Sequence, residues 1–292
     1  MAAINLKILF VINQFAGNNQ NTCWQMNIDN YFSQKSWTIN YFLLAKNPDI
    51  EILKQYIFNQ NPATVVAVGG DGTIMMLANI IAGSNIALGI LPGGSANAMA
   101  LELGIPNTID NALKIIENGN IKTIDTIRFN NKTTCLHISD IGINALLIKY
   151  FNQGNLRGKL GYAKLFFKVL FNHQKMSVSI RSTDLNIQRQ ALMVAITNAT
   201  MYGTGLLINP KGILDDGKFE IIIVQRLSLF AIIKMILKVG TFNPNEIEVF
   251  PFTNIEINTR RKVHFQIDGE YMGRTKYITA QIVPLSCRLI VP

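Results

Sequence analysis

The stretch Thr64-Val-Val-Ala-Val-Gly-Gly-Asp-Gly-Thr73 decides the fold of the first part of this chain. Its first five residues are mostly apolar and β-branched, which predicts a buried strand ending at Gly69. After Thr73 the pattern becomes helical, so we expect a tight strand-to-helix turn. Glycines let the backbone approach a ligand, and a helix N-terminus attracts phosphate. The alternative is an ordinary turn with Asp71 or Thr73 as N-cap.

A second glycine-rich turn follows the next predicted strand. The strand covers 86–91, the turn is Pro92-Gly-Gly-Ser-Ala-Asn97, and a helix follows over 98–103. Strands alternating with helices predict a Rossmann-like α/β domain with a parallel sheet over 1–122. Its other predicted strands cover 8–12 and 36–44, and its other helices cover 24–32, 49–59 and 108–118. Both glycine-rich turns would then lie at the carboxyl edge of the sheet, where such folds bind ligands.

The pattern changes near residue 122 to short strands separated by polar or glycine-bearing turns. We therefore predict an antiparallel β-sandwich over 123–287, interrupted by helices at 158–171 and 228–239. The predicted strands cover 124–129, 133–139, 177–181, 190–197, 219–224, 254–257, 264–267 and 277–282. Asp215-Asp-Gly217 and Asp268-Gly269 taken alone predict type I′ hairpin turns.

Composition narrows the classes of function. The 292 residues carry 27 Lys and Arg against 18 Asp and Glu, a net charge of +9, which favours an anionic partner. The three cysteines are far apart, so neither a disulfide framework nor a zinc ribbon is predicted. We expect a cytoplasmic protein, because no segment has the length of a signal-peptide core or a membrane span. No nucleic-acid-binding motif occurs, so we expect no nucleic-acid partner.

Four motifs in a fixed order resemble the diacylglycerol kinase catalytic-domain family. They are Gly69-Gly-Asp-Gly-Thr73, Gly89-Ile-Leu-Pro-Gly-Gly-Ser-Ala-Asn97, Asp215-Asp-Gly-Lys-Phe219 and Gln266-Ile-Asp-Gly-Glu270. That family is related to sphingoid-base and ceramide kinases and more distantly to NAD kinase. The resemblance implies a nucleotide-binding α/β domain, a β-sandwich lipid and metal domain, and an active site in the cleft between them. It also implies that the segment 288–292 returns to the first domain.

The resemblance implies ATP and Mg²⁺ as cofactors and a hydroxyl of a membrane lipid as acceptor. Asp71 would act with the metal at the transferred phosphate, and Glu270 would be the general base for the lipid hydroxyl. The residues implied to bind ATP are Asn13, Gly17, Gly69, Gly70, Gly72, Thr73, Gly94, Ser95 and Asn97. A structural magnesium would be held by Asp216 and the backbone carbonyls of Ile213 and Lys218, with Asp125 linking it to the active site.

The chain also departs from the family pattern. Gln14 stands where the family usually has proline, and Leu44 stands where a nucleotide-contacting threonine is expected. Ala98 replaces a common aspartate, which leaves the lipid open among diacylglycerol, phosphatidylglycerol, sphingoid bases and ceramide. Two alternatives stay open at this point: an NAD kinase-like enzyme, and a catalytically weak lipid- or nucleotide-binding protein on the same scaffold.

Basic and apolar residues are interleaved in two stretches. The first covers Tyr150–Phe171, and the second places Lys234 and Lys238 beside the apolar residues of 229–237. Each stretch predicts either a helix packed on the sandwich or a helix that meets an anionic membrane. A lipid kinase must reach its substrate, so we expect peripheral binding at the inner face of the membrane. The oligomeric state stays open, a homodimer included.

Overall fold

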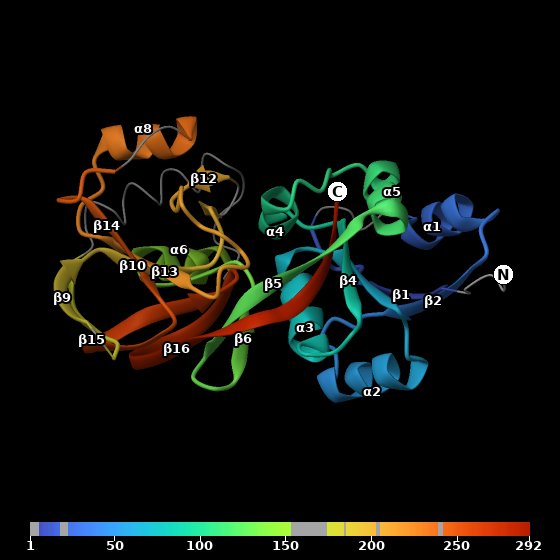
Figure 1. Cartoon of the computed structure of the whole chain (residues 1–292), viewed down its shortest axis with the longest axis horizontal. Coiled ribbons are helices and arrows are strands. Elements are labelled where there is room, and N and C mark those ends of the chain that lie inside the picture. Colours follow the sequence, from blue (N-terminus) through green and yellow to red (C-terminus); the bar gives the residue numbers. More distant parts are fainter. Residues whose placement is uncertain (1–5, 18–22, 153–173, 184, 203–204, 239–241) are drawn as a thin grey trace. The chain divides into compact units, whose positions relative to one another are not determined.

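The computed structural model describes residues 6–17, 23–152, 174–183, 185–202, 205–238 and 242–292 (Figure 1). The chain divides into two compact units, Met1–Ile124 with Leu285–Pro292 and Asp125–Pro284. The predicted helix at 158–171 and most of the basic stretch 150–171 lie outside the described residues.

The first unit is built on a parallel sheet, as the sequence predicted. Its strands follow the order β4-β3-β1-β2, with the end of β16 pairing β4 on the other side. The bounds are β1 (Leu6–Ile12), β2 (Trp37–Leu43), β3 (Thr64–Gly69), β4 (Ala87–Pro92) and β16 (Glu270–Val291). β3 is buried because both faces of the sheet carry helices, which explains its continuous apolar sequence.

The described residues of the first unit include five helices. Figure 1 shows α1 and α5 on one side of the sheet and α2 and α3 on the other. Their bounds are α1 (Trp24–Phe32), α2 (Ile50–Gln60), α3 (Asp71–Ile81), α4 (Ala98–Glu102) and α5 (Ile109–Asn118). The side chain of Asp49 caps α2 as predicted, accepting hydrogen bonds from the amides of Glu51 and Ile52. The N-cap of α3 is Gly70, so neither Asp71 nor Thr73 serves that purpose.

The second unit is the predicted antiparallel β-sandwich. One ladder runs β14-β13-β10-β7-β15, β8 joins β15 to β9, and β15 forms a long hairpin with β16. The strands are β5 (Asn120–Phe129, which enters from the first unit), β6 (Thr133–Cys135), β7 (Ile138–Gly142), β8 (Met176–Arg181), β9 (Asn186–Ala191), β10 (Met193–Thr197), β11 (Met201–Tyr202), β12 (Leu206–Leu207), β13 (Phe219–Val224), β14 (Ile247–Phe252) and β15 (Asn254–Ile267).

The described residues of the second unit include two helices, α6 (Ile143–Asn152) and α8 (Leu229–Leu237). The sequence predicted α8 but missed α6, β14 and the separation of β9 from β10. A core of aliphatic side chains joins α6 and α8 to the strands, including Leu147, Ala231, Met235 and Ile222. Among the described residues, no helix has both the length and the apolar character that a bilayer span requires.

A cluster of three side chains ties α1 to α5 and gives a pH-dependent prediction. The Tyr31 hydroxyl donates to the Glu117 carboxylate at 2.6 Å, and Lys35 forms an ion pair with the same carboxylate. The hydrogen bond from Lys35, followed by that from Tyr31, holds the pKa of Glu117 below its usual range. A lowered pKa means that the charged form stabilises the folded state above the unfolded pKa, and that this contribution is lost as pH falls.

Glu117→Gln is therefore expected to lower the free energy of unfolding at pH 7 by no more than about 1 kcal/mol, because the pair is partly exposed. The difference between the two proteins should begin to shrink as pH falls through about 4.3, where the glutamate of the unfolded chain becomes protonated, and should vanish once the folded carboxylate, whose pKa is lower, is protonated too. Urea unfolding at pH 7 and pH 3.5 measures both values. An equal difference at both pH values would show that the charge of Glu117 is not the cause.

Candidate active site

Three loops meet at the carboxyl ends of β1, β3 and β4. The Asn13 amide donates to the Thr73 hydroxyl at 3.0 Å, and the backbone amide of Asn13 donates to the carbonyl of Val68 at 2.9 Å. The amide of Gly93 donates to the carbonyl of Gly69 at 2.8 Å. The structure thus brings together the three segments that the sequence predicted to bind phosphate.

The glycines of these loops are packed against one another through their backbones. A Cβ atom on Gly94 would lie 2.4 Å from the Cα of Gly70, and one on Gly17 would lie 2.6 Å from the carbonyl oxygen of Gly93. Gly17 also has a φ of +63°, which favours glycine. Side chains at these positions cannot be accommodated without moving a loop. The surface that the three loops present is therefore made largely of backbone.

Asp71 lies at the start of α3 but stabilises a different helix. Its two carboxylate oxygens accept hydrogen bonds from the amides of Ala98 and Met99, each at 3.1 Å. The N-cap position of α4, Asn97, has a φ of +51° and gives no side-chain cap to its own helix. Asp71 therefore caps α4 from across the site, and about two of its four acceptor positions stay available to a ligand.

The remaining predicted residues of this site differ in their exposure. The Asn97 side-chain oxygen accepts from the amide of Gly94 at 2.9 Å, which shapes the second turn, while Ser95 is exposed at its tip. Gly72 is half-buried in the first turn of α3. Of the two departures from the family pattern, Gln14 is exposed, whereas Leu44 is 4% exposed and belongs to the core.

Glu270 is the first residue of β16 and follows a two-residue hairpin turn. Asp268 and Gly269 have φ values of +45° and +86°, as the predicted type I′ turn requires. Glu270 pairs with Ile267 across the turn, and its side chain is exposed. The tight turn fixes the position of the Glu270 backbone, and the exposed Glu270 side chain is accessible to a substrate.

A buried network holds this turn in place. The Asp268 carboxylate accepts hydrogen bonds from the backbone amides of Leu136, His137 and Ile138 at 2.8–3.0 Å. Burial raises the pKa of Asp268 against the opposing effect of these donors. The Gln266 side-chain oxygen accepts from the amide of Gly269 at 2.8 Å. The side chains of Asp268 and Gln266 therefore bind the backbone amides of the neighbouring segment 136–138 and of the turn itself.

Asp140 extends this network, and the sequence analysis missed it. It is fully buried and accepts hydrogen bonds from Gln266 at 2.5 Å, from Asn144 at 2.7 Å and from the amide of Ala145 at 2.9 Å. It thereby links the start of α6 to the turn that carries Glu270. The signal in the sequence was weak, because Asp140 follows the predicted strand 133–139 and only its neighbours Ile138 and Ile141 indicate that its carboxylate is buried and needs a partner.

The predicted metal loop lies beside Asp125, as the sequence predicted. The buried Asp125 carboxylate accepts from the amide of Gly217 at 2.6 Å, and its backbone amide donates to the carbonyl of Leu214 at 2.7 Å. Asp216 accepts from the amide of Lys218 at 3.0 Å, and Ile213 is exposed.

The type I′ prediction for 215–217 is wrong, because Gly217 has a positive φ but Asp216 has not.

The donor atoms at this loop suit a hard cation. Carboxylate and carbonyl oxygens are the ligands that Mg²⁺ prefers, usually together with several water molecules. The side-chain oxygen of Asn198 is buried near the loop without a hydrogen-bond partner among the described residues, while its amide donates to the carbonyls of Asp125 and Leu214. In the described part of the chain no three His, Cys, Asp or Glu side chains gather to hold a metal. A magnesium ion here would therefore depend on Asp216, backbone carbonyls and water.

Two family models match the chain. The diacylglycerol kinase catalytic domain matches residues 7–129, and the YegS C-terminal NAD kinase beta sandwich-like domain matches residues 138–291. Together they cover both units.

Relatives and solved structures match over most of the length. "Probable lipid kinase YegS" of Escherichia coli O1:K1 and of Shigella boydii serotype 18 are each 30% identical over 235 residues, 78% of this chain and 78% of theirs. A diacylglycerol kinase structure from Bacillus anthracis is 20% identical with a TM-score of 0.75, covering 98% of this chain and 97% of its own. Another structure from that organism, 22% identical with the same coverage, has a TM-score of 0.80. These structures confirm the fold.

Proposed function

Because this chain belongs to the YegS-type lipid kinase family, with a diacylglycerol kinase catalytic domain followed by a YegS-type C-terminal domain, we propose that it transfers the γ-phosphate of ATP to a hydroxyl of a membrane lipid. The observation that carries the proposal is the backbone surface formed by the loops after β1, β3 and β4. Phosphoryl transfer depends mainly on positioning and on stabilising charge, and backbone N–H groups supply both.

Asp71 and Glu270 have different tasks in this proposal. Asp71 holds α4, and with it the second glycine-rich turn, in position beside the phosphates. Glu270 accepts the proton of the lipid hydroxyl as the oxygen attacks phosphorus, because an alcohol has a pKa far above neutral pH. The buried network of Asp268, Gln266 and Asp140 keeps the turn before Glu270 in one conformation.

Mg²⁺ bound with ATP would supply positive charge that offsets the charge of the phosphates. The structural magnesium would be held by Asp216 and the backbone carbonyls of Ile213 and Lys218, next to Asp125. We further propose that the protein works in the cytoplasm at the inner face of the membrane, where both ATP and a lipid substrate are available.

Transfer of labelled γ-phosphate from Mg·ATP to a panel of lipids in mixed micelles tests the proposed function. The panel contains diacylglycerol, phosphatidylglycerol, a sphingoid base, ceramide and, as a competing acceptor, NAD. Label in one lipid supports the proposal and identifies the substrate. Label in NAD alone would overturn the lipid acceptor. ATP binding without any transfer would favour a catalytically weak binding protein, with Gln14 and Leu44 as the first residues to replace by those of the family pattern.

Gly94→Ala is expected to weaken ATP binding at least tenfold, because the added methyl group would force the loops at Gly70 and Gly94 apart. The matched control is Gly104→Ala, where a Cβ meets no atom within 4 Å although φ is +71°. The control should lose stability through backbone strain but keep its affinity for ATP. Isothermal titration calorimetry with ATP compares the two. Equal loss of affinity in both variants would show that the packing of the loops does not matter for nucleotide binding.

A further inference from the structure

The outward face of α8 is apolar, although the helix lies on the outside of its unit (Figure 1). The side facing the core contributes Ala231 and Met235, which are 2% and 6% exposed. At 100° per residue, the opposite side of the helix is centred on Ile233. The exposed fractions of the apolar side chains around that centre are 66% for Phe230, 43% for Ile233, 57% for Ile236 and 64% for Leu237.

Such a face is unusual for a helix in water. A surface helix normally places polar residues opposite its buried stripe, whereas α8 has apolar side chains on both sides. The strand β12 packs against α8 and adds the exposed side chain of Leu206. Contiguous exposed apolar patches of a few hundred Å² commonly mark a binding surface.

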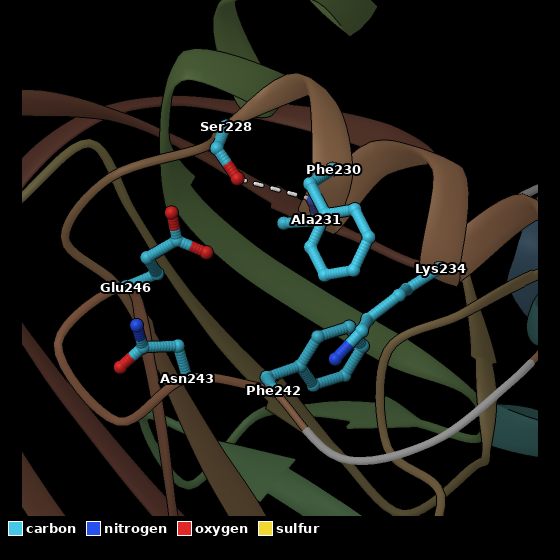
Figure 2. A pocket seen from close by; sticks show the side chains of 7 residues that line it. All are labelled: Ser228, Phe230, Ala231, Lys234, Phe242, Asn243 and Glu246. Atoms are coloured by element: carbon cyan, nitrogen blue, oxygen red, sulfur yellow. Dashed lines mark hydrogen bonds between the residues drawn. The ribbon is translucent and has the colours of Figure 1, made fainter.

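Two lysines lie beside this face, Lys234 at its edge next to Phe230 and Lys238 at the C-terminal end of the helix, where its Nζ atom lies 3.4 Å from the sulfur of Met201. Lys238 ends the helix and is exposed, and Lys234 places its Nζ atom 4.9 Å from the centre of the Phe230 ring. A pocket of about 440 Å³ adjoins the helix beside Lys234, and Figure 2 shows Phe242 next to the lysine and Glu246 on the other side of the pocket. Positive charge beside exposed apolar side chains is complementary to anionic lipid headgroups above an acyl layer.

We propose that the exposed face of α8 binds the surface of an anionic bilayer, with Phe230, Ile233, Ile236 and Leu237 entering the headgroup region and Lys234 and Lys238 contacting lipid phosphates. This inference rests on the proposed function, which brings the chain to a membrane. A second copy of the chain suits the face less well. A two-fold symmetric contact through this face would bring lysines of like charge together.

Co-sedimentation with vesicles tests the inference without relying on catalysis. The full-length protein, without ATP, is mixed with vesicles of equal parts phosphatidylglycerol and phosphatidylcholine at low salt. Lys234→Gln with Lys238→Gln should weaken binding about thirty-fold, and Ile233→Ser with Leu237→Ser at least tenfold. In Phe230→Trp, tryptophan emission should shift to the blue when these vesicles are added, because the indole leaves water.

The matched control is α2 in the first unit, which has exposed apolar residues but no apolar face. The paired substitutions are Ile52→Ser with Phe58→Ser in α2, and Lys54→Gln in α2 with Lys46→Gln in the loop before it, all at exposed positions. The control variants should bind vesicles like the parent protein. Unchanged binding in the α8 variants, or equal losses in the α2 variants, would overturn the inference. The inference would also be overturned if the parent protein self-associates through this face. Gel filtration would then show a smaller particle for the α8 variants than for the parent protein, and the α8 variants would still bind vesicles.

Transfer of phosphate to a short-chain lipid dissolved in water separates this inference from the proposed function. If the proposed function fails, no label reaches that lipid, yet vesicle binding still depends on α8. If the α8 inference fails, label reaches the short-chain lipid while vesicle binding is independent of the substitutions. The α8 variants should phosphorylate the soluble lipid as fast as the parent protein.

Discussion

Replacing Glu270 with glutamine should lower kcat for lipid phosphorylation by roughly two to four orders of magnitude, the usual contribution of a positioned general base. Glutamine has nearly the same shape but cannot accept the proton of the hydroxyl. Because the Glu270 side chain is exposed at the end of a tight turn, the substitution should leave the fold and the affinity for ATP unchanged. Single-turnover transfer from labelled ATP measures the chemical step directly.

The control for this variant is Glu256→Gln, which removes an exposed carboxylate from the same β15–β16 hairpin, opposite Thr279. Its kcat should equal that of the parent protein. The loss in Glu270→Gln should also diminish at high pH if free hydroxide or a more ionised acceptor replaces the base. A kcat within a factor of three of the parent value would exclude Glu270 as the general base.

Asp71→Asn should reduce kcat about a thousandfold if Asp71 acts with Mg²⁺ at the transferred phosphate, because the carboxylate would then help to position the positive charge that stabilises the transition state. Two effects combine in this variant. The negative charge is lost, and the new amide nitrogen cannot accept one of the two hydrogen bonds from Ala98 and Met99. Loss of half a helix cap should lower the free energy of unfolding by about 1 kcal/mol. Steady-state kinetics and urea unfolding measure both changes.

Asn97→Ala separates the two effects. This substitution loosens the second glycine-rich turn by removing the acceptor for the Gly94 amide, but it leaves the Asp71 carboxylate in place. If Asp71 acts through Mg²⁺ at the phosphates, Asp71→Asn should lose far more kcat than Asn97→Ala. Equal losses in the two variants would mean that Asp71 works only by holding α4, as a positioning residue.

Elements with a strong local pattern were predictable from the sequence. α1 and β13 occupy the predicted residues, and α2 begins after its predicted cap at Asp49. Local pattern also gave the two glycine-rich turns after β3 and β4, because turns after parallel strands meet at one edge of the sheet. β14 was missed because Pro251 argues against a strand, although this strand lies at the end of its ladder, where proline is tolerated.

Contacts between distant segments were beyond the reach of local pattern. The predicted strand 133–139 is broken at Leu136–His137 because the Asp268 carboxylate, far along the chain, takes the amides that a ladder would use. α6 was missed because it begins directly after β7, where Gly142 has a φ of +108° and Asp140 accepts from the amide of Ala145. The hydrogen bonds from the α4 amides to Asp71 were also beyond the reach of local pattern, because Asp71 and α4 follow different strands.

The return of β16 to the first unit affects the order in which the chain can fold during synthesis. Arg288 and Leu289 pair with Ala87 and Leu88 of β4, and the Arg288 guanidinium donates to the carbonyl of Asn85 at 2.8 Å. Ribosomes release a chain from its N-terminus, and units that are contiguous in sequence can fold as they emerge. Here β4, which carries the second glycine-rich turn, has an open edge until after the second unit has been made. The first unit, although begun first, is therefore the last to be completed, and until then its unpaired strand edge is a site where nascent chains can associate wrongly.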